Sequence, residues 1–393
     1  MKTSIHYSNI IFKIFLVLKL HDVYNHIVIK HLITIIISAL TFGHKGKIKD
    51  FANNSENHRT TIAHFFNAGK WDHNILLKRK KQLVLKMIYR EAKRSKSPIY
   101  IITDDTGASK TQPSSKAVNP IENAYFYQSN LKKKQDYGHQ AVAVMLSCNG
   151  ITLNYDWILY TKNDSKIKIV ERIAEELPIP PVISYWLCDS WYTSSDLIRI
   201  FLKKGFHTIS ALKTNRIIFP NGIKQQIKEF ATHIEKTDAH VSLVTVDKKQ
   251  YYVYRYEGKL KDSEEIVVLI TYSKNNWGKI NALRAFISTD ISLSTKKILE
   301  KYTIRWSIEV FFRQIKNTLA INKYQIRKTT GIKRYWLIMS FVHVICCLSA
   351  KDNYSFLAGY QFLSQQIKKE QISYIYNCGK NNIPLDKIFK SLL

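Results

Sequence analysis

Acidic residues are scarce in this chain of 393 residues. Sixty Lys and Arg stand against thirty Asp and Glu, which leaves a formal charge of +30. So basic a surface attracts polyanions over long distances before any specific contact forms. Nucleic acid is the partner that this charge favours, and a membrane surface is the competing polyanion. The abundance of Ile, Asn, Lys and Tyr is also typical of an AT-biased coding sequence, whatever the protein does.

Cysteine is rare, and no pair has the C-x-x-C spacing of a metal or dithiol motif. The five cysteines lie inside apolar runs, as expected of reduced core residues: Cys148, Cys188, Cys346, Cys347 and Cys378. This pattern predicts a location inside the cell.

Long uninterrupted apolar runs are also missing. The stretch from Ile10 to Phe42 is apolar, but lysines, histidines and an aspartate interrupt it too often for a spanning helix, which needs about 20 residues. No signal-type cleavage site follows it. The run Trp336–Ala350 is too short to span a bilayer and predicts a buried helix. We therefore predict packed helices here and no membrane partner.

What is present is globular composition, with 45% apolar and 12% aromatic residues. The length favours two or three domains. We predict a helical domain over residues 1–95, for which DNA is a candidate ligand. Within it, His58–Tyr89 has the spacing of a basic amphipathic helix, whose run Lys78–Lys81 either faces solvent or contacts DNA.

The order of elements after residue 96 carries the fold prediction. Asn149-Gly150 is the strongest turn signal, because both residues tolerate the positive φ of a tight hairpin turn. The predicted elements are, in chain order, a strand over Ile99–Thr103, a hairpin of His139–Cys148 and Ile151–Tyr160, a helix over Ser165–Leu177, a strand over Val182–Cys188, a helix over Thr193–Lys204 and a strand over His207–Leu212. This is the RNase H order, a mixed sheet with an antiparallel hairpin at one edge and a parallel remainder.

The rest of the chain completes this α/β prediction. Residues 96–214 form the first part of the RNase H-like domain, and short alternating strands over residues 215–280 indicate an all-β insertion. A second part over residues 281–350 resumes with the strand Arg284–Thr289 and a long helix from about Ser294 to Ile321. Residues 351–393 form a C-terminal helical segment.

Three acidic residues stand where this order would bring them together. Asp104 ends the first predicted strand, Asp189 ends the strand after the first crossover helix, and Glu309 lies on the long helix. The carboxyl ends of neighbouring strands are where open α/β sheets place their active sites. Converging carboxylates repel one another unless cations hold them, and Mg²⁺ or Mn²⁺ suits such ligands. Either aspartate considered singly is more often a cap or turn residue.

The long helix decides between these readings. Tyr302, Arg305, Glu309 and Lys316 lie within about 60° of one another on a helix that turns about 100° per residue. The opposite side is apolar and consists of Ile304, Ile308, Phe311 and Ile315. A surface ion pair would explain Arg305 and Glu309 but not the other two polar residues.

The spacing Tyr302-x2-Arg305-x3-Glu309-x6-Lys316 resembles the Y-R-E-K signature of bacterial insertion-sequence DDE transposases, in the group called insertion-sequence family four. The segments Thr103–Gly107 and Cys188–Tyr192 also resemble that group. The resemblance covers roughly Pro98 to Ala350, and the family carries a β-rich insertion at the place of residues 215–280.

The resemblance implies metal-dependent DNA cleavage at transposon ends and strand transfer into target DNA. Asp104, Asp189 and Glu309 would bind two Mg²⁺ ions, with Mn²⁺ able to substitute. Tyr302, Arg305 and Lys316 would hold the DNA backbone. The partners would be the terminal inverted repeats and target DNA, bound by a homodimer in the bacterial cytoplasm.

Two alternatives stay open at this point. Asp105 could replace Asp104 as the first metal ligand, because the acid is doubled. The chain could also be an inactive relative of such an enzyme that acts as a DNA-binding regulator. A repair nuclease of RNase H type shares the chemistry but gives no reason for the insertion or for the Tyr-Arg-Lys stripe.

Overall fold

The computed structural model describes residues 9–41, 44–53, 55, 57–129, 132–260, 265–350 and 353–392. The predicted helices of the apolar N-terminal stretch are present up to residue 41, and Phe42 lies outside the described residues. The N-terminal helices are α1 (Asn9–Val17), α2 (His26–Thr41), α3 (Ile48–Ala52), α4 (Arg59–Asn67) and α5 (His73–Ser95). The single predicted helix over His58–Tyr89 is therefore wrong, because α4 and α5 are separate helices.

The strands and helices that follow alternate as expected, with one addition. They are β1 (Tyr100–Ser109), β2 (Tyr125–Ser129), β3 (Lys134–Cys148), β4 (Ile151–Tyr160), α6 (Lys166–Glu176), β5 (Ser184–Cys188), α7 (Ser195–Lys203) and β6 (Phe206–Leu212). The turn between β3 and β4 has positive φ at both Asn149 and Gly150, as predicted. Strand β2 was not predicted, because its register comes from pairing with β3.

The strands β1 to β6 belong to one mixed sheet of ten strands, which also includes β9 to β12. Its order is β2-β3-β1-β5-β6-β12-β11-β10-β9, and β4 also pairs with β3. The pairs β1 with β5 and β5 with β6 are parallel, while β3 runs antiparallel to β1 and β4. The predicted hairpin edge and parallel centre are therefore present.

The region predicted as an all-β insertion extends this same sheet. Its elements are β7 (Ile217–Ile218), η1 (Pro220–Gly222), β8 (Gln225–Gln226), α8 (Ile227–Phe230), β9 (Val241–Val246), β10 (Lys249–Lys259), β11 (Glu265–Ser273) and η2 (Lys274–Asn276), with η3 (Ile280–Ala282) at its end. The strand predicted over Arg284–Thr289 follows as β12 (Arg284–Ser288). "All-β" is wrong, because α8 and three short 3₁₀ turns lie among the strands. β12 pairs with β6 on one side and with β11 on the other, so it joins the strands β9, β10 and β11 to the central sheet.

The predicted long helix over Ser294–Ile321 is made of three consecutive pieces. These are α9 (Thr295–Thr303), η4 (Ile304–Trp306) and α10 (Ser307–Asn317), and Thr303, Ile304, Trp306 and Ser307 all keep right-handed helical angles. The tighter 3₁₀ turn changes the hydrogen-bond pattern without reversing the chain. The apolar side is buried as predicted, with Ile308, Phe311 and Ile315 at most 1% exposed.

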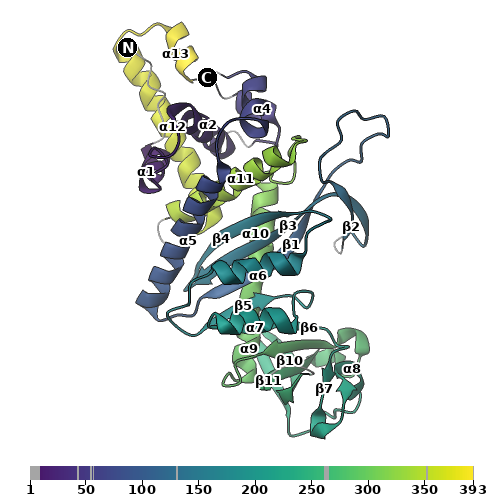
Figure 1. Ribbon diagram of the computed structural model, residues 1–393. Coiled ribbons are helices and arrows are strands. Elements are labelled where there is room, and N and C mark those ends of the chain that lie inside the picture. Colours follow the sequence, from purple (N-terminus) through teal and green to yellow (C-terminus); the bar gives the residue numbers. More distant parts are fainter. Residues whose placement is uncertain are drawn as a thin grey trace.

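Two layers of helices cover the sheet (Figure 1). α6 and α7 lie on one face, and α10 passes behind the sheet against β1. The remaining helices, α11 (Thr329–Ser349), α12 (Phe356–Lys380) and α13 (Leu385–Leu392), gather with α1, α2 and α4 at the end of the molecule farthest from β10 and β11. α11 is long and apolar enough to cross a membrane by length and composition, but it is largely buried within the protein.

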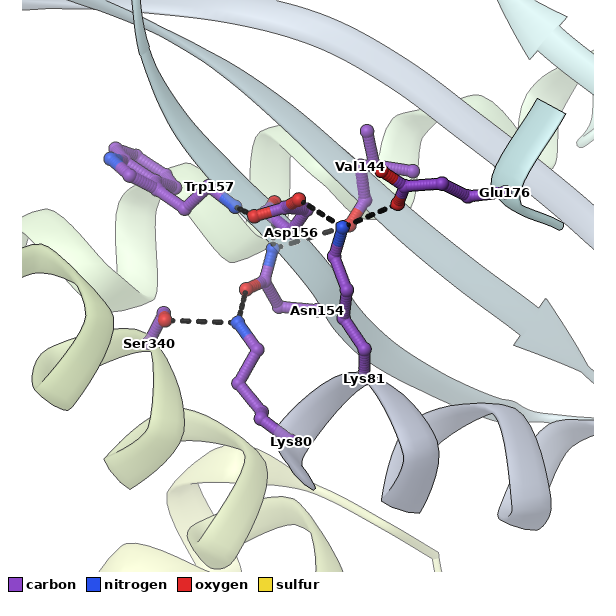
Figure 2. Close-up of polar contacts among 8 residues, drawn as sticks. All are labelled: Lys80, Lys81, Val144, Asn154, Asp156, Trp157, Glu176 and Ser340. Carbon is purple, nitrogen blue, oxygen red and sulfur yellow. Dashed lines mark hydrogen bonds and ion pairs between the residues drawn. The ribbon is translucent and has the colours of Figure 1, made fainter. Parts of the chain in front are cut away.

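The basic run Lys78–Lys81 is not a uniformly solvated face, because Lys78 is exposed but Lys80 is buried. Lys80 is fully buried and donates from Nζ to Oδ1 of Asn154 (2.8 Å) and to Oγ of Ser340 (3.0 Å). Lys81 lies 2.7 Å from carboxylate oxygens of both Asp156 and Glu176. Figure 2 shows how these two lysines tie α5 to β4, α6 and α11.

Candidate active site

Asp104 and Asp189 lie side by side at the centre of the sheet. The parallel pairing of β1 with β5 runs from Tyr100 and Tyr185 to Ile102 and Leu187. Each aspartate comes two residues after the last pair, so the two lie at the same level and on the same face. The negative charge of Asp189 is close enough to raise the pKa of Asp104.

The prediction that Asp104 ends its strand is wrong. β1 continues through Asp104 and Asp105 to Ser109, because it pairs with β3 over ten consecutive positions. β5 ends at Cys188, so the β5 side of β1 has no strand partner beyond this point. The aspartates therefore stand where one strand stops and its neighbour goes on.

Arg305, Glu309 and Lys316 approach β1 near Asp104 from the face of the sheet that α10 covers. The Arg305 guanidinium donates to Oδ2 of Asp104 at 2.8 Å and lies 3.6 Å from Oε1 of Glu309. It also lies 5.7 Å from the ring centre of Tyr302. Lys316 donates from Nζ to Oγ1 of Thr106, two residues beyond Asp104 on the same face. The six residues that the sequence singled out thus lie around Asp104 and Thr106, although the three acids do not form a tight cluster among the described residues.

Asp105 points to the opposite face of the sheet, as strand alternation requires. Its Oδ2 lies 2.7 Å from Nζ of Lys166, the first residue of α6, and its Oδ1 accepts from the Tyr192 hydroxyl at 3.0 Å. Asp105 is thus already paired on the α6 side, while Asp104 faces Arg305. This arrangement favours Asp104 as the residue that faces Glu309.

Burial of negative charge changes the acid-base behaviour of the site. Burial raises the pKa of Asp104 to about 7, with Arg305 opposing the shift and Asp189 adding to it. Burial also raises the pKa of Asp189. On the cationic side, burial lowers the pKa of Lys316, which the nearby Glu309 partly offsets. Asp104 and Asp189 therefore bind protons more readily than exposed carboxylates do, and Lys316 binds its proton less readily than an exposed lysine.

A first prediction concerns the pH dependence of stability without metal. Because the pKa of Asp104 is about 7 when folded and near 3.8 when unfolded, the folded state holds the extra proton between these values. The stability that this group contributes therefore falls as pH rises from about 4 through 7. Asp104→Asn cannot titrate. We expect its melting temperature, relative to wild type, to rise between pH 5 and pH 8 in buffer with a chelator.

The control for this measurement is Asp196→Asn, which removes an exposed carboxylate on α7. Its melting temperature relative to wild type should stay constant over the same pH range. A constant difference for Asp104→Asn as well would mean that burial of Asp104 does not perturb its titration.

The donor set fits a hard divalent cation. Three carboxylates supply oxygen ligands of the kind that Mg²⁺ and Mn²⁺ prefer. Among the described residues no three His, Cys, Asp or Glu side chains stand close enough together to form a ready metal cluster. Arg305 is the cation that Asp104 and Glu309 share instead, and its buried Nε has no hydrogen-bond partner in the described part of the chain.

Sequence reasoning gave no role at the site to two residues near it: Lys166, and Tyr192, which was interpreted as a loop contact or a packed aromatic. Lys166 and Tyr192 both contact Asp105, from the start of α6 and from the turn after β5. The consecutive aspartates Asp104 and Asp105 were the signal in the sequence, because a second carboxylate beside the first needs a hydrogen-bond or ion-pair partner of its own. The sequence does not show that these two residues, 61 and 87 positions away, provide it.

A mixed sheet that brings carboxylates, an arginine and a lysine together beside the end of a central parallel strand is typical of enzymes that act on phosphodiesters. The family described as transposase DDE domain matches residues 95–345, and the chain belongs to this family. The mixed sheet and flanking helices are consistent with the RNase H-like fold of such a domain. No curated protein matches the chain.

Proposed function

We propose that this protein catalyses DNA transposition, by metal-dependent cleavage at transposon ends followed by strand transfer into target DNA. The observation that carries the proposal is the approach of Arg305 to Asp104 and Glu309, and of Lys316 to Thr106, beside the end of β5, where Asp189 lies next to Asp104. Membership of the transposase DDE domain family supports the same reaction class. The Tyr302-to-Lys316 spacing supports placement in insertion-sequence family four.

In this proposal Asp104, Asp189 and Glu309 hold two Mg²⁺ or Mn²⁺ ions. The ions supply activation of the attacking water or 3′ hydroxyl and stabilisation of the departing oxygen. Arg305 leaves Asp104 and turns its planar fork to a phosphate, and Lys316 adds a point charge beside Thr106. Tyr302 packs against the Arg305 guanidinium and keeps it aimed at the DNA backbone.

The proposal includes a partner and an assembly. The substrates are the terminal inverted repeats of the element and target DNA, which a net charge of +30 attracts from a distance. Because two transposon ends must be cut in concert, we propose a homodimer on DNA. We place this activity in the bacterial cytoplasm, where the DNA is.

The direct test is cleavage of the element's own ends. Purified protein with Mg²⁺ or Mn²⁺ should nick linear DNA that carries these ends, and Ca²⁺ should support binding without cutting, because Ca²⁺ takes more ligands in looser geometry. An inactive regulator would bind the same DNA and cut it with neither metal. That result would replace the proposed activity with the regulator alternative.

A second prediction tests the phosphate contacts of the helix. Lys316→Ala and Arg305→Ala should each weaken binding to end DNA and flatten the dependence of log Kd on log salt by about one unit per lost contact. Salt-titrated binding measures both quantities. Lys380→Ala, which removes an exposed charge from the end of α12, outside the residues that match the family, is the control and should leave the slope unchanged. If the two helix variants melt early and keep the wild-type slope, these side chains have a structural role instead.

A further inference from the structure

Tyr192 contacts Asp189 through its backbone, and it contacts Asp105, the neighbour of Asp104, through its side chain. Its backbone N–H, together with that of Trp191, points at Oδ1 of Asp189, at 3.4 and 2.9 Å. Its side chain is fully buried, and the hydroxyl donates to Oδ1 of Asp105 at 3.0 Å. One residue therefore links the turn that carries Asp189 to the strand that carries Asp104.

The link continues from Asp105 to Asp104 through the backbone. The N–H of Asp105 donates to Oδ1 of Asp104 at 2.8 Å, while Oδ2 of Asp104 faces Arg305. Lys166 neutralises the Asp105 carboxylate at 2.7 Å from the α6 side. The side chain of Asp105 is thus held on one face of β1 while its N–H orients the Asp104 carboxylate.

The link through Tyr192 fixes the position of Asp189 relative to β1. The pairing of β1 with β5 cannot do so, because its last pair comes two residues before the aspartates. Two carboxylates in this position repel each other, and no ladder hydrogen bond between the two strands fixes their separation. Thr193 anchors the Asp189 turn to β6, since its hydroxyl donates to the carbonyl of Ala211 at 2.8 Å. Tyr192 provides the corresponding anchor to β1.

We propose that Tyr192 and Asp105 are positioning residues that set the spacing of Asp104 and Asp189 for binding divalent ions. The inference rests on the proposed function, because it concerns the same metal site. Neither residue touches the ions or the DNA in this proposal. Both act through the aspartates, as hydrogen-bond partners of metal ligands commonly do.

Tyr192→Phe removes only the hydroxyl and is the sharpest test. The affinity for Mn²⁺, measured by electron paramagnetic resonance of the free ion, should fall by about 10-fold to 100-fold, the usual effect of losing a partner of a metal ligand. Tyr335→Phe is the matched control: Tyr335 is also fully buried, and its hydroxyl donates to the carbonyl of Ala320 at 3.0 Å. The control should lower the melting temperature comparably and leave the Mn²⁺ affinity unchanged.

Asp105→Asn provides a second variant if Tyr192→Phe does not fold, and it should weaken Mn²⁺ binding in the same range. Wild-type Mn²⁺ affinity in a folded Tyr192→Phe or Asp105→Asn protein would overturn the inference and leave the proposed function intact. If the wild type binds Mn²⁺ and the variants bind it weakly, but no protein cuts DNA, the inference stands and the proposed function fails. A wild type that binds no Mn²⁺ would overturn both.

Discussion

Asp189→Asn should produce a protein that binds transposon-end DNA with near-wild-type affinity and does not cut it. The substitution keeps a side-chain oxygen that accepts from the N–H groups of Trp191 and Tyr192, so the turn should survive. It removes one of three negative charges that would hold the ions. We expect the rate of end cleavage to fall by more than about 10³-fold, at least the loss seen when one electrostatic stabiliser is removed.

The measurement is single-turnover cleavage of labelled end DNA, with binding checked on the same DNA. Asp104→Asn should be equally inactive, whereas Asp105→Asn should retain measurable cutting that improves at higher metal concentration. Asp196→Asn, on the exposed side of α7, should cut like the wild type. Cleavage at the wild-type rate by Asp189→Asn would remove Asp189 from the catalytic site.

The sequence predicted the local parts of this site well because their signals are local. The stripe from Tyr302 to Lys316 depends on helical spacing, which a 3₁₀ turn at Ile304–Trp306 does not destroy. Asn149 and Gly150 identify their turn through backbone preference alone. Both the helical stripe and the turn are determined by residues close to one another in the sequence.

The errors concern contacts between distant segments. The strand β1 was predicted to stop at Thr103, because two consecutive aspartates are typical of a loop, but pairing with β3 and the partners Arg305 and Lys166 keep them in a strand. The all-β insertion was predicted without its connection to the central sheet, because periodicity does not reveal that β11 pairs with β12 and β12 with β6. Lys80 was predicted in a charged face, although Asn154 and Ser340 bury it.

Lys81→Met should lower the free energy of unfolding by about 3–5 kcal/mol, the usual result of removing one partner from a buried ion pair. Asp156, whose side chain is only 5% exposed, lies 2.7 Å from the ammonium of Lys81. Without Lys81, the Asp156 carboxylate would keep the N–H of Trp157 at 2.8 Å but would lose its ion-pair partner. Glu176 would lose less, because 41% of its side chain is exposed to water. Urea unfolding followed by circular dichroism measures the change.

The neighbouring lysine provides the sharpest comparison (Figure 2). Lys80 donates to a neutral amide and a neutral hydroxyl, and burial lowers its pKa to about 7. Lys80→Met leaves these two groups unsatisfied, which costs roughly 1–3 kcal/mol, but it also removes a buried cation that has no carboxylate bonded to it. We therefore expect a smaller loss than for Lys81→Met, and almost none for Lys78→Met, which changes an exposed lysine on the same helix. Equal losses at positions 80 and 81 would mean that the volume of the side chain, and not the charge of Asp156, determines the stability of this junction.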